Sequence, residues 1–372
     1  MPKVEEILTF SQAHKSKIQK YFNGGYYYSN TPKLLQEIKK HELNALFLLS
    51  IETPAELCKF LKTSFFELEE RINNPVYKYY AIRKKRGGER QINAPEKKLK
   101  AIQRRLNYFL QAYYLWIKPN EVFGFVVNPH YLGNYCNIAE NAKPHIGKKH
   151  LLNIDLKDFF PSISASRVKS VFTSSYFNFS EQIATALTLL TTYEGKLPIG
   201  IPTSPIISNF VCFQLDADLK SFCETNGLRF TRYADDLTFS SDTLITNDII
   251  FDIINLIKKN GFKINEKKLR LKSANRKQAV TGLTVNEKVN IDRRFLKKIR
   301  AMLHDLTTNG IEIATKRHFN LNGEIDTKQC SKLINRLEGY INFVGQVRGK
   351  NDTVYTKLKQ PFDQVFSKIA TS

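Results

Sequence analysis

The sequence is poor in cysteine and contains no long apolar segment. Its 5 cysteines form an odd set without a C-x-x-C pair, which argues against a disulfide framework and against a structural zinc site. No run of about 18 apolar residues is present, so we expect no membrane span. No basic stretch leads into an apolar segment at the start of the sequence, so we expect no secretory signal. The cysteine usage and the lack of a membrane span or secretory signal predict a reduced, soluble, cytoplasmic protein. The sequence also has no internal repeats.

Positive charge is what the sequence has in excess. Its 372 residues include 57 Lys and Arg against 35 Asp and Glu, which gives a formal net charge of +22. Such a surplus is most often carried for a polyanionic partner such as nucleic acid. The 17 Tyr and 26 Phe offer rings for base stacking, although we expect most of them in the core. A hydrophobic fraction of 42% excludes wholesale disorder.

The densest basic segment, residues 83–105, has ten basic and two acidic residues. It overlaps a predicted hairpin, with strands over 78–82 and 90–93 and a turn at Gly87-Gly88. A run of like charge is often only a solvated surface. We favour contact with phosphate groups here, because the run precedes an acidic site in the chain.

Strands and helices are mixed in the middle of the chain without a strict βαβ repeat, which predicts an α+β fold. The last part, after about residue 290, reads as helical, with Asp292 as a cap. We therefore expect three parts: a helical N-terminal extension over 1–62, a central domain over 63–290 and a helical lobe over 291–372. The extension is either an addition to the central domain or a docking surface. The expected strands and helices of the last two parts are 150–154, 180–190, 205–223, 228–233, 237–240, 249–257, 332–347 and 353–369.

Three aspartates are candidates for metal ligands. Asp235 and Asp236 lie in a tight turn between two apolar strands, and Asp155 ends another apolar strand. Carboxylates at the ends of neighbouring strands can hold two divalent cations about 3.5–4 Å apart, as in-line phosphoryl displacement requires. Hard oxygen ligands and a phosphate substrate point to Mg²⁺. An exposed Asp-Asp turn without function is the alternative, because Asp is a favoured turn residue.

These aspartates lie in segments that resemble the motifs of reverse transcriptases. Tyr233-Ala234-Asp235-Asp236 resembles the catalytic box of that family, and further motifs follow in the expected chain order. An ordered set is far more specific than any single motif. The resemblance covers roughly residues 76–290. Its other segments are 87–103, 153–163, 197–205 and 261–268.

Two shorter segments narrow the resemblance. Asn141-Ala142-Lys143-Pro144-His145 is similar to the N-A-x-x-H signature of bacterial retron reverse transcriptases, and Val280-Thr281-Gly282 to their V-T-G signature. The sequence thus resembles an RNA-directed DNA polymerase of the retron type. Two alternatives stay open: another bacterial reverse transcriptase, group II intron-like or defence-associated, and a catalytically silent RNA-binding scaffold.

The resemblance implies a right-hand polymerase with fingers, a palm made of an antiparallel sheet backed by helices, and a helical thumb. It implies two Mg²⁺ ions held by Asp155, Asp235, Asp236 and the Leu156 carbonyl. Phe160 would exclude ribonucleotides, and Lys268 would lie near the leaving pyrophosphate. The full set of residues implied for the dNTP is Lys84, Lys85, Arg90, Phe160, Gly200 and Lys268. The set expected to bind RNA is Asn141, Ala142, His145, Val280, Thr281, Gly282, Arg293, Arg294, Lys297 and Arg300.

The same resemblance implies the partners. They are a structured noncoding RNA that is both template and primer, dNTPs, an RNA-linked single-stranded DNA product and an accessory effector protein. The resemblance also implies a role in defence against phage and a place in the bacterial cytoplasm, with no membrane as a partner. Synthesis would start at the 2′-hydroxyl of an internal guanosine. One position departs from the family: Ile199 stands where Gln is usual. The change removes an amide beside the nascent base pair but leaves all three acids.

Overall fold

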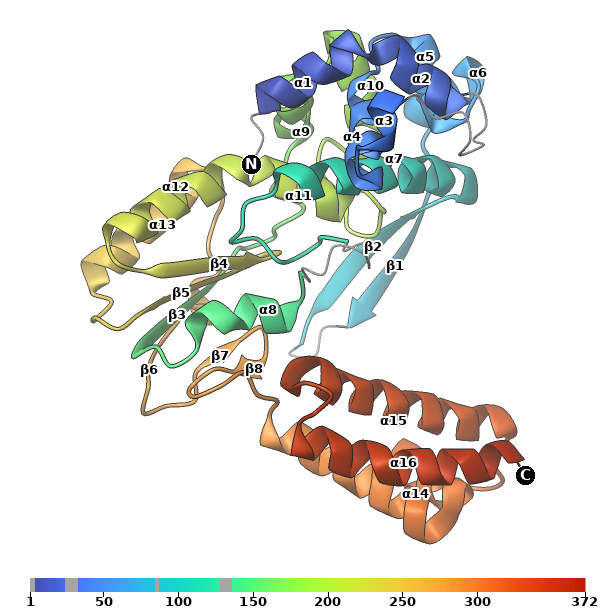
Figure 1. The fold of residues 1–372 in the computed structure, drawn as a ribbon, viewed down its shortest axis with the longest axis vertical. Coiled ribbons are helices and arrows are strands. Elements are labelled where there is room, and N and C mark those ends of the chain that lie inside the picture. The colour runs from blue at the N-terminus through green and yellow to red at the C-terminus, as the bar shows by residue number, and fades with distance from the viewer. Residues whose placement is uncertain (1–3, 24–32, 84–86, 128–135, 372) are drawn as a thin grey trace. The chain divides into compact units, whose positions relative to one another are not determined.

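The computed structural model describes residues 4–23, 33–83, 87–127 and 136–371 (Figure 1). Its contacts divide the chain into two compact units, which we call unit 1 and unit 2. Unit 1 comprises residues 1–136, 153–238 and 245–269, and unit 2 comprises residues 137–152, 239–244 and 270–372. Helices alternate irregularly with the strands of three sheets, without a strict βαβ repeat, so the fold is α+β as the sequence predicts.

The first part of unit 1 is helical. Helix α4 packs against the long helix α7, and α1 and α2 pack on α4. Helix α5 begins after a capping box in which the Thr53 hydroxyl accepts from the Glu56 amide while the Glu56 carboxylate accepts from the Thr53 amide. The helices of this part are α1 (Val4–Ala13), α2 (Lys15–Asn23), α3 (Lys33–Gln36), α4 (Lys40–Leu49), α5 (Pro54–Leu61), α6 (Phe65–Asn73) and α7 (Lys97–Ile117).

Between α6 and α7 lies an antiparallel hairpin of β1 (Tyr77–Arg83) and β2 (Glu89–Pro95). Tyr79 pairs with Asn93, and Ile82 pairs with Arg90. The hairpin is exposed along most of its length, which agrees with the expectation that its basic side chains are available to a ligand.

The four-stranded sheet has the order β4-β5-β3-β6, and helices α12 and α13 lie along it (Figure 1). Its strands are β3 (His150–Asp155), β4 (Arg229–Tyr233), β5 (Asp236–Ser241) and β6 (Arg270–Ser273). The surrounding helices and the 3-10 turn η4 are α9 (Ala165–Thr173), α10 (Glu181–Thr191), α11 (Ser204–Val211), α12 (Phe213–Thr225), α13 (Asn247–Lys259) and η4 (Glu266–Lys268).

The single helix expected over 205–223 is two helices in the structure. Cys212 separates α11 from α12, and its amide donates to the carbonyls of Phe210 and Ser208 instead of making only the regular helical bond. Its ψ of −2° tightens the turn there. An apolar run long enough for one helix gave no signal for this break.

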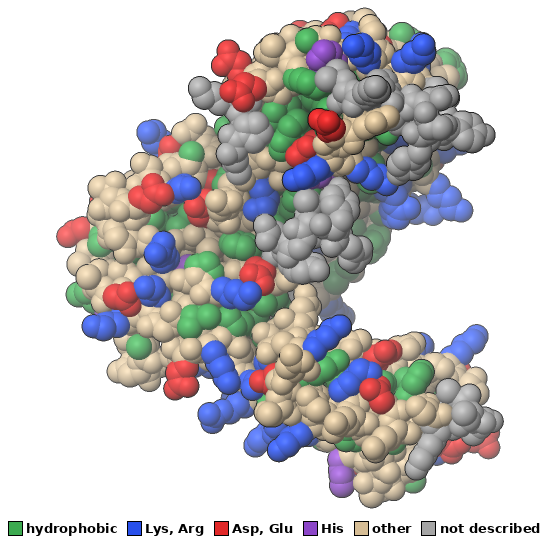
Figure 2. Space-filling model, viewed as in Figure 1, with side chains coloured by type: hydrophobic (Ala, Val, Ile, Leu, Met, Phe, Trp, Pro, Cys, Tyr) green, Lys and Arg blue, Asp and Glu red, His purple; other side chains and the backbone are tan. Residues whose placement is uncertain are grey.

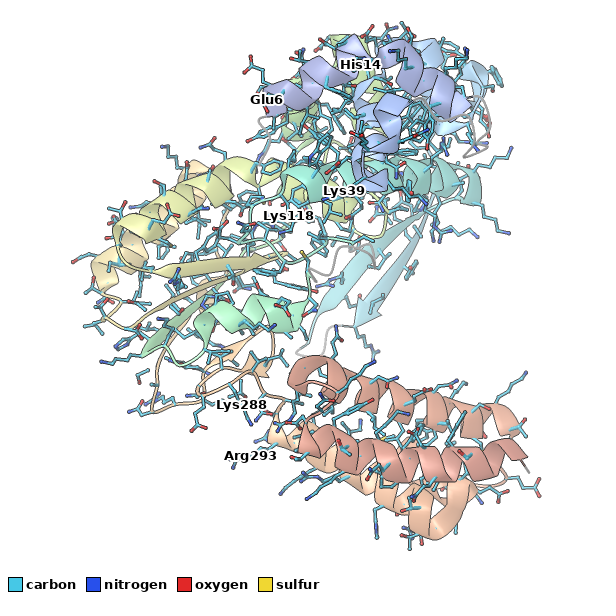
Figure 3. The ribbon with its side chains drawn as sticks, in the orientation of Figure 1. Glu6, His14, Lys39, Lys118, Lys288 and Arg293 are labelled. Carbon is cyan, nitrogen blue, oxygen red and sulfur yellow. The ribbon has the colours of Figure 1, made fainter. Side chains whose placement is uncertain are left out.

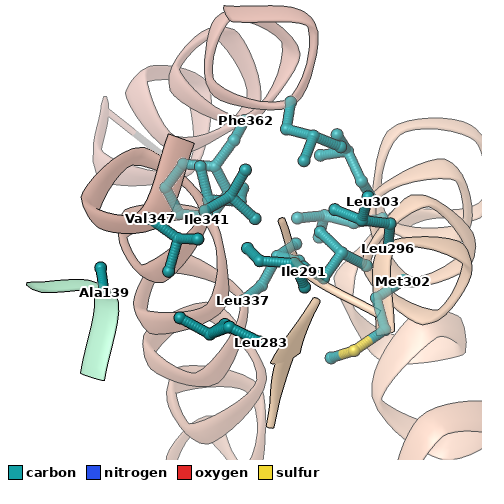
Figure 4. Close-up of a cluster of buried hydrophobic side chains, with 14 of the residues drawn as sticks. Ala139, Leu283, Ile291, Leu296, Met302, Leu303, Leu337, Ile341, Val347 and Phe362 are labelled. Atoms are coloured by element: carbon teal, nitrogen blue, oxygen red, sulfur yellow. The ribbon is translucent and has the colours of Figure 1, made fainter. Parts of the chain in front are cut away.

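Unit 2 contains the C-terminal helices, which pack on one another as a three-helix bundle. Short elements α8, β7 and β8 join the same apolar core, in which Ala139 and Leu283 lie with bundle residues such as Leu337 (Figure 4). Gly310, at φ 79°, kinks α14. The elements are α8 (Ile138–Ala142), the 3-10 turn η3 (Lys143–His145), β7 (Ala279–Val280), β8 (Leu283–Thr284), α14 (Arg293–Phe319), α15 (Thr327–Arg348) and α16 (Thr353–Thr371).

Positive side chains are spread over the surface. On the face shown in Figure 2, Lys and Arg lie scattered among uncharged residues in both units and do not form one isolated patch. Within the described ranges, no helix is long and apolar enough to cross a membrane.

Candidate active site

The three candidate acids are side by side in unit 1. Asp155 is the last residue of β3, Asp236 is the first residue of β5, and Asp235 lies in the two-residue turn between β4 and β5. Strands β3 and β5 are neighbours in the sheet, and the Leu156 amide donates to the Asp235 carbonyl at 2.9 Å. Residues about 80 positions apart in the chain are thereby brought to one edge of the sheet.

Burial, together with repulsion among the acids, raises the pKa values of two of them. Burial raises the pKa of Asp235, and repulsion from Asp155 adds to the rise. The pKa of Asp236 is raised to about 7, first because protein atoms desolvate its carboxyl and then because Asp235 and Asp155 repel the negative charge. Lys268 opposes the rise at both groups, and Arg90 opposes it at Asp235. Groups of like charge that share a site behave in this way.

Lys268 neutralises the third acid. Its Nζ donates to both carboxylate oxygens of Asp155, at 2.7 and 2.9 Å. Carboxylate oxygens suit Mg²⁺, and a divalent cation would offset the repulsion at Asp236, so the residue types fit such a cation. As the side chains stand, however, no three His, Cys, Asp or Glu residues within the described ranges are arranged to hold a metal ion.

A pocket of about 680 Å³ opens beside the acids. Asp155, Asp235, Lys268, Arg90 and Phe160 all line it, so the structure brings together candidates from four separate motifs. The predicted residues Lys84 and Lys85 lie outside the described ranges. Sequence reasoning missed other lining residues, among them Tyr79, Tyr193 and Lys196.

Gly200 lies at the edge of this region and packs on the hairpin. Its φ is +115°, and an added Cβ would lie 2.6 Å from Ile92 Cγ2 and 2.9 Å from the Asn93 carbonyl oxygen. Only glycine fits such a backbone. The preceding residue, Ile199, accepts a hydrogen bond from the Asn93 amide through its carbonyl at 2.7 Å. This anchor uses main-chain atoms, so it is indifferent to the replacement of Gln by Ile.

The N-A-x-x-H segment is largely buried in unit 2. Asn141, Ala142 and His145 are at most 1% exposed, and the His145 Nδ1 lies 2.7 Å from the Ser240 hydroxyl. Burial lowers the pKa of His145 to about 3, and Lys148 adds to the effect. The imidazole is therefore neutral at ordinary pH and faces the interior.

The other RNA-binding candidates of unit 2 lie further out. Val280 is buried, Thr281 is half-buried with φ 47°, and Gly282 is exposed at the β7–β8 turn. The Thr281 hydroxyl donates to the Ile138 carbonyl at 3.4 Å, which connects the V-T-G segment to α8, the helix that ends with Asn141 and Ala142. The basic candidates on α14 begin with Arg293, which follows Lys288 in the chain (Figure 3). All four of them are exposed: Arg293, Arg294, Lys297 and Arg300.

Sequence reasoning missed a buried network behind the β4–β5 turn. Arg232 is fully buried, and its Nε and Nη2 each donate to the Asp216 carboxylate at 2.6 Å. Its Nη1 donates to Asn209 Oδ1 at 3.0 Å and to the Ala234 carbonyl at 3.2 Å. The available signal was a charged residue two positions after Phe230 in the strand, because side chains two positions apart lie on the same face.

Comparison with known proteins agrees with this geometry. The family described as "Reverse transcriptase (RNA-dependent DNA polymerase)" matches residues 82–286. The chain is 37% identical to "Retron Ec86 reverse transcriptase" of Escherichia coli over 240 residues, which cover 62% of this chain and 70% of that protein. It is 33% identical to "Retron Mx65 reverse transcriptase" of Myxococcus xanthus over 254 residues, 63% of this chain and 56% of that protein.

Among solved structures, the chain is similar to telomerase from Candida albicans in complex with a fragment of telomeric RNA. The TM-score is 0.43 and the identity 11%, over 79% of this chain and 64% of the other, which is too distant to bear on function. The identity to the retron enzymes and the span of the matched family region are decisive. The chain belongs to the retron reverse transcriptases, which are RNA-directed DNA polymerases.

Proposed function

We propose that this protein copies part of a structured noncoding RNA into single-stranded DNA that stays linked to the RNA. The observation that carries the proposal is the grouping of Asp155, Asp235 and Asp236 beside a pocket that Arg90 and Phe160 also line. Members of the family copy RNA, and reverse transcriptase domains generally use divalent metal ions.

We propose that the three aspartates and the Leu156 carbonyl hold two Mg²⁺ ions. Such ions lower the pKa of an attacking hydroxyl and offset charge on the leaving pyrophosphate. The acids of this chain supply oxygen ligands, and the desolvated pair at the β4–β5 turn has the larger need of a counter-charge. Lys268 exchanges its contact with Asp155 for the phosphates of the nucleotide, where its ammonium group can hold or donate a proton.

The pocket side chains have separate tasks in this proposal. The planar guanidinium of Arg90 binds the triphosphate through paired hydrogen bonds, with Lys84 or Lys85 as a second cation. Phe160, half-buried against the ring of Phe125, presents a ring edge to the sugar and excludes a 2′-hydroxyl. Gly200 keeps the loop close to β2 and so leaves space for the base pair.

RNA recognition is divided between surface and interior in unit 2. The exposed basic side chains of α14, from Arg293 to Arg300, bind phosphates, and this binding depends on salt. The exposed turn at Thr281 and Gly282 contacts the cognate RNA, while Asn141, Ala142, His145 and Val280 support that turn from the interior.

The proposal also covers how DNA synthesis is primed and what the product does in the cell. Synthesis starts at the 2′-hydroxyl of an internal guanosine, and the product, msDNA, takes part in defence against phage together with an accessory effector protein. These points rest on membership of the retron family and on the presence of both signature segments.

The test is to purify the protein with its nucleic acid and to assay dNTP incorporation on the cognate RNA. Asp235→Asn and Asp236→Asn should abolish incorporation and leave RNA binding largely intact. A debranching enzyme should release the DNA from the RNA. A variant that polymerises at the normal rate would refute the metal assignment, and a linear product made only from an added primer would indicate another kind of reverse transcriptase. RNA binding without any incorporation would indicate a silent scaffold.

A further inference from the structure

The β4–β5 turn contains a residue with an unfavourable backbone conformation, which neighbouring residues must stabilise. Only Ala234 and Asp235 separate β4 from β5, and Ala234 has φ +60°, in the left-handed region that residues with a Cβ avoid. Such a conformation persists where its surroundings determine it. Because Asp235 and Asp236 follow directly, the directions of both carboxylates depend on this residue.

Arg232 reaches the turn from behind. Its side chain is 0% exposed, and Nη1 donates to the Ala234 carbonyl at 3.2 Å. The guanidinium is itself held in plane by two bonds of 2.6 Å to Asp216 of α12 and one of 3.0 Å to Asn209 of α11. A planar fork with five donors can make this set of bonds, whereas a lysine ammonium cannot.

A second contact fixes the turn from another segment. A Cβ on Gly124 would lie 2.3 Å from the Ala234 amide nitrogen, so the two backbones touch. The Asn209 Nδ2 donates to the Gly124 carbonyl at 3.0 Å, and Asn209 Oδ1 accepts from Arg232. Asn209 therefore joins both supports of Ala234.

We propose that Arg232 is a positioning residue, which through the Ala234 carbonyl sets the orientation in which Asp235 and Asp236 bind divalent cations. Asp216 and Asn209 act through Arg232. This inference rests on the proposed metal-dependent function. Stability alone is a weak reason for such a pair, because apolar side chains of similar volume often replace a buried ion pair without loss.

Because apolar side chains can replace a buried ion pair, a double variant tests the proposal without unfolding the protein. Arg232→Met combined with Asp216→Leu removes both charges together and keeps the interior filled. We expect a folded protein whose half-saturating Mg²⁺ concentration for polymerisation is about tenfold to a hundredfold higher, the usual effect of losing a partner that orients metal ligands. Mn²⁺ binding to the RNA-free protein, measured by calorimetric titration, should weaken in the same proportion.

Two further variants complete the test. Asn209→Ala removes the joint between the supports, leaves the ion pair intact and should shift the same two readouts in the same direction. Arg105→Met is the matched control, because Arg105 is a half-buried arginine of unit 1 that donates to the Phe60 carbonyl away from the turn. It should lower thermal stability and leave the Mg²⁺ dependence unchanged.

The outcomes separate the two proposals. Suppose that the wild-type protein binds Mn²⁺ and polymerises. If the double variant or Asn209→Ala is folded and shows the wild-type metal dependence, Arg232 only stabilises the fold and this inference is wrong. If the wild-type protein shows neither metal binding nor incorporation, the proposed function is wrong instead. Arg232→Lys should lie between the double variant and wild type, since it keeps the charge opposite Asp216 and loses the fork.

Discussion

Among single residues, Asp236 is the acid whose protonation matters most near neutral pH. Its pKa of about 7 reflects desolvation of the carboxyl and the nearby charges of Asp235 and Asp155. Between about pH 4 and pH 7, the folded, metal-free protein thus keeps a proton that the unfolded chain has already released. The free energy of unfolding contributed by this group falls as pH rises through that window and is unchanged above it.

We predict from this that divalent cations bind more weakly below neutral pH, by up to about tenfold per pH unit, because a cation must displace the proton. Calorimetric titration with Mn²⁺ at about pH 6 and about pH 8 measures the difference. Asp236→Asn is the control, and its weaker binding should be nearly independent of pH. Equal wild-type affinity at both values would contradict the raised pKa of Asp236.

Phe160 carries a second prediction at this scale. Phe160→Ala opens space at the sugar and should raise ribonucleotide incorporation relative to dNTP by about tenfold or more, since one bulky group separates the two substrates. Competition between labelled dNTP and rNTP gives the ratio. Phe179→Ala is a control, because the Phe179 ring is buried against Phe177 and is not among the residues that line the pocket. A similar ratio in both variants would remove Phe160 as the gate.

At the scale of elements, the η3 turn that follows α8 contributes a buried side chain, whereas α14 carries exposed basic side chains. His145 is buried and neutral beside Ser240, so His145→Ala should leave a cavity and an unpaired hydroxyl and lower the free energy of unfolding by about 2 kcal/mol or more. The fraction that stays folded should keep the wild-type salt dependence of RNA binding, because a neutral interior imidazole binds no phosphate.

The double variant Arg293→Gln with Arg294→Gln should show the converse. Its thermal stability should stay close to wild type, since both side chains are exposed. The slope of log affinity against log salt should fall in magnitude by about 1 for each phosphate that the variant no longer binds. Filter binding over a range of salt concentrations measures both slopes. A changed slope in His145→Ala would place that residue on the RNA surface after all.

Local signals predicted these elements well and their junctions poorly. Asp292 as a cap marked the start of α14, and the apolar run before Asp155 marked β3, because both depend on neighbours in sequence. The division of the expected helix at Cys212 and the kink of α14 at Gly310 were not predicted. The apolar run continues across Cys212, and a single glycine inside a helical pattern does not say that the helix bends.

For the molecule as a whole, ordered motifs indicated both the family and the acids that the fold brings together. Asp155 and Asp235 were found as motif members, since each lies in a short segment with its own pattern. The support behind them was not found, because Arg232, Asp216 and Gly124 meet only once the chain is folded. The inward position of His145 was equally invisible, because a signature pattern does not say which way a side chain faces.

The contact between Lys268 and Asp155 has a consequence for handling the intact protein. Since the chain supplies its own ammonium counter-ion to that carboxylate, treatment with EDTA should lower the melting temperature of the wild-type protein only slightly. Lys268→Met should melt earlier in EDTA and recover when Mg²⁺ is restored, as scanning calorimetry would show; a wild-type protein that melts early in EDTA would contradict this. The resting enzyme would then be a molecule that tolerates metal starvation, and its folding would not wait on the supply of the ion that its chemistry needs.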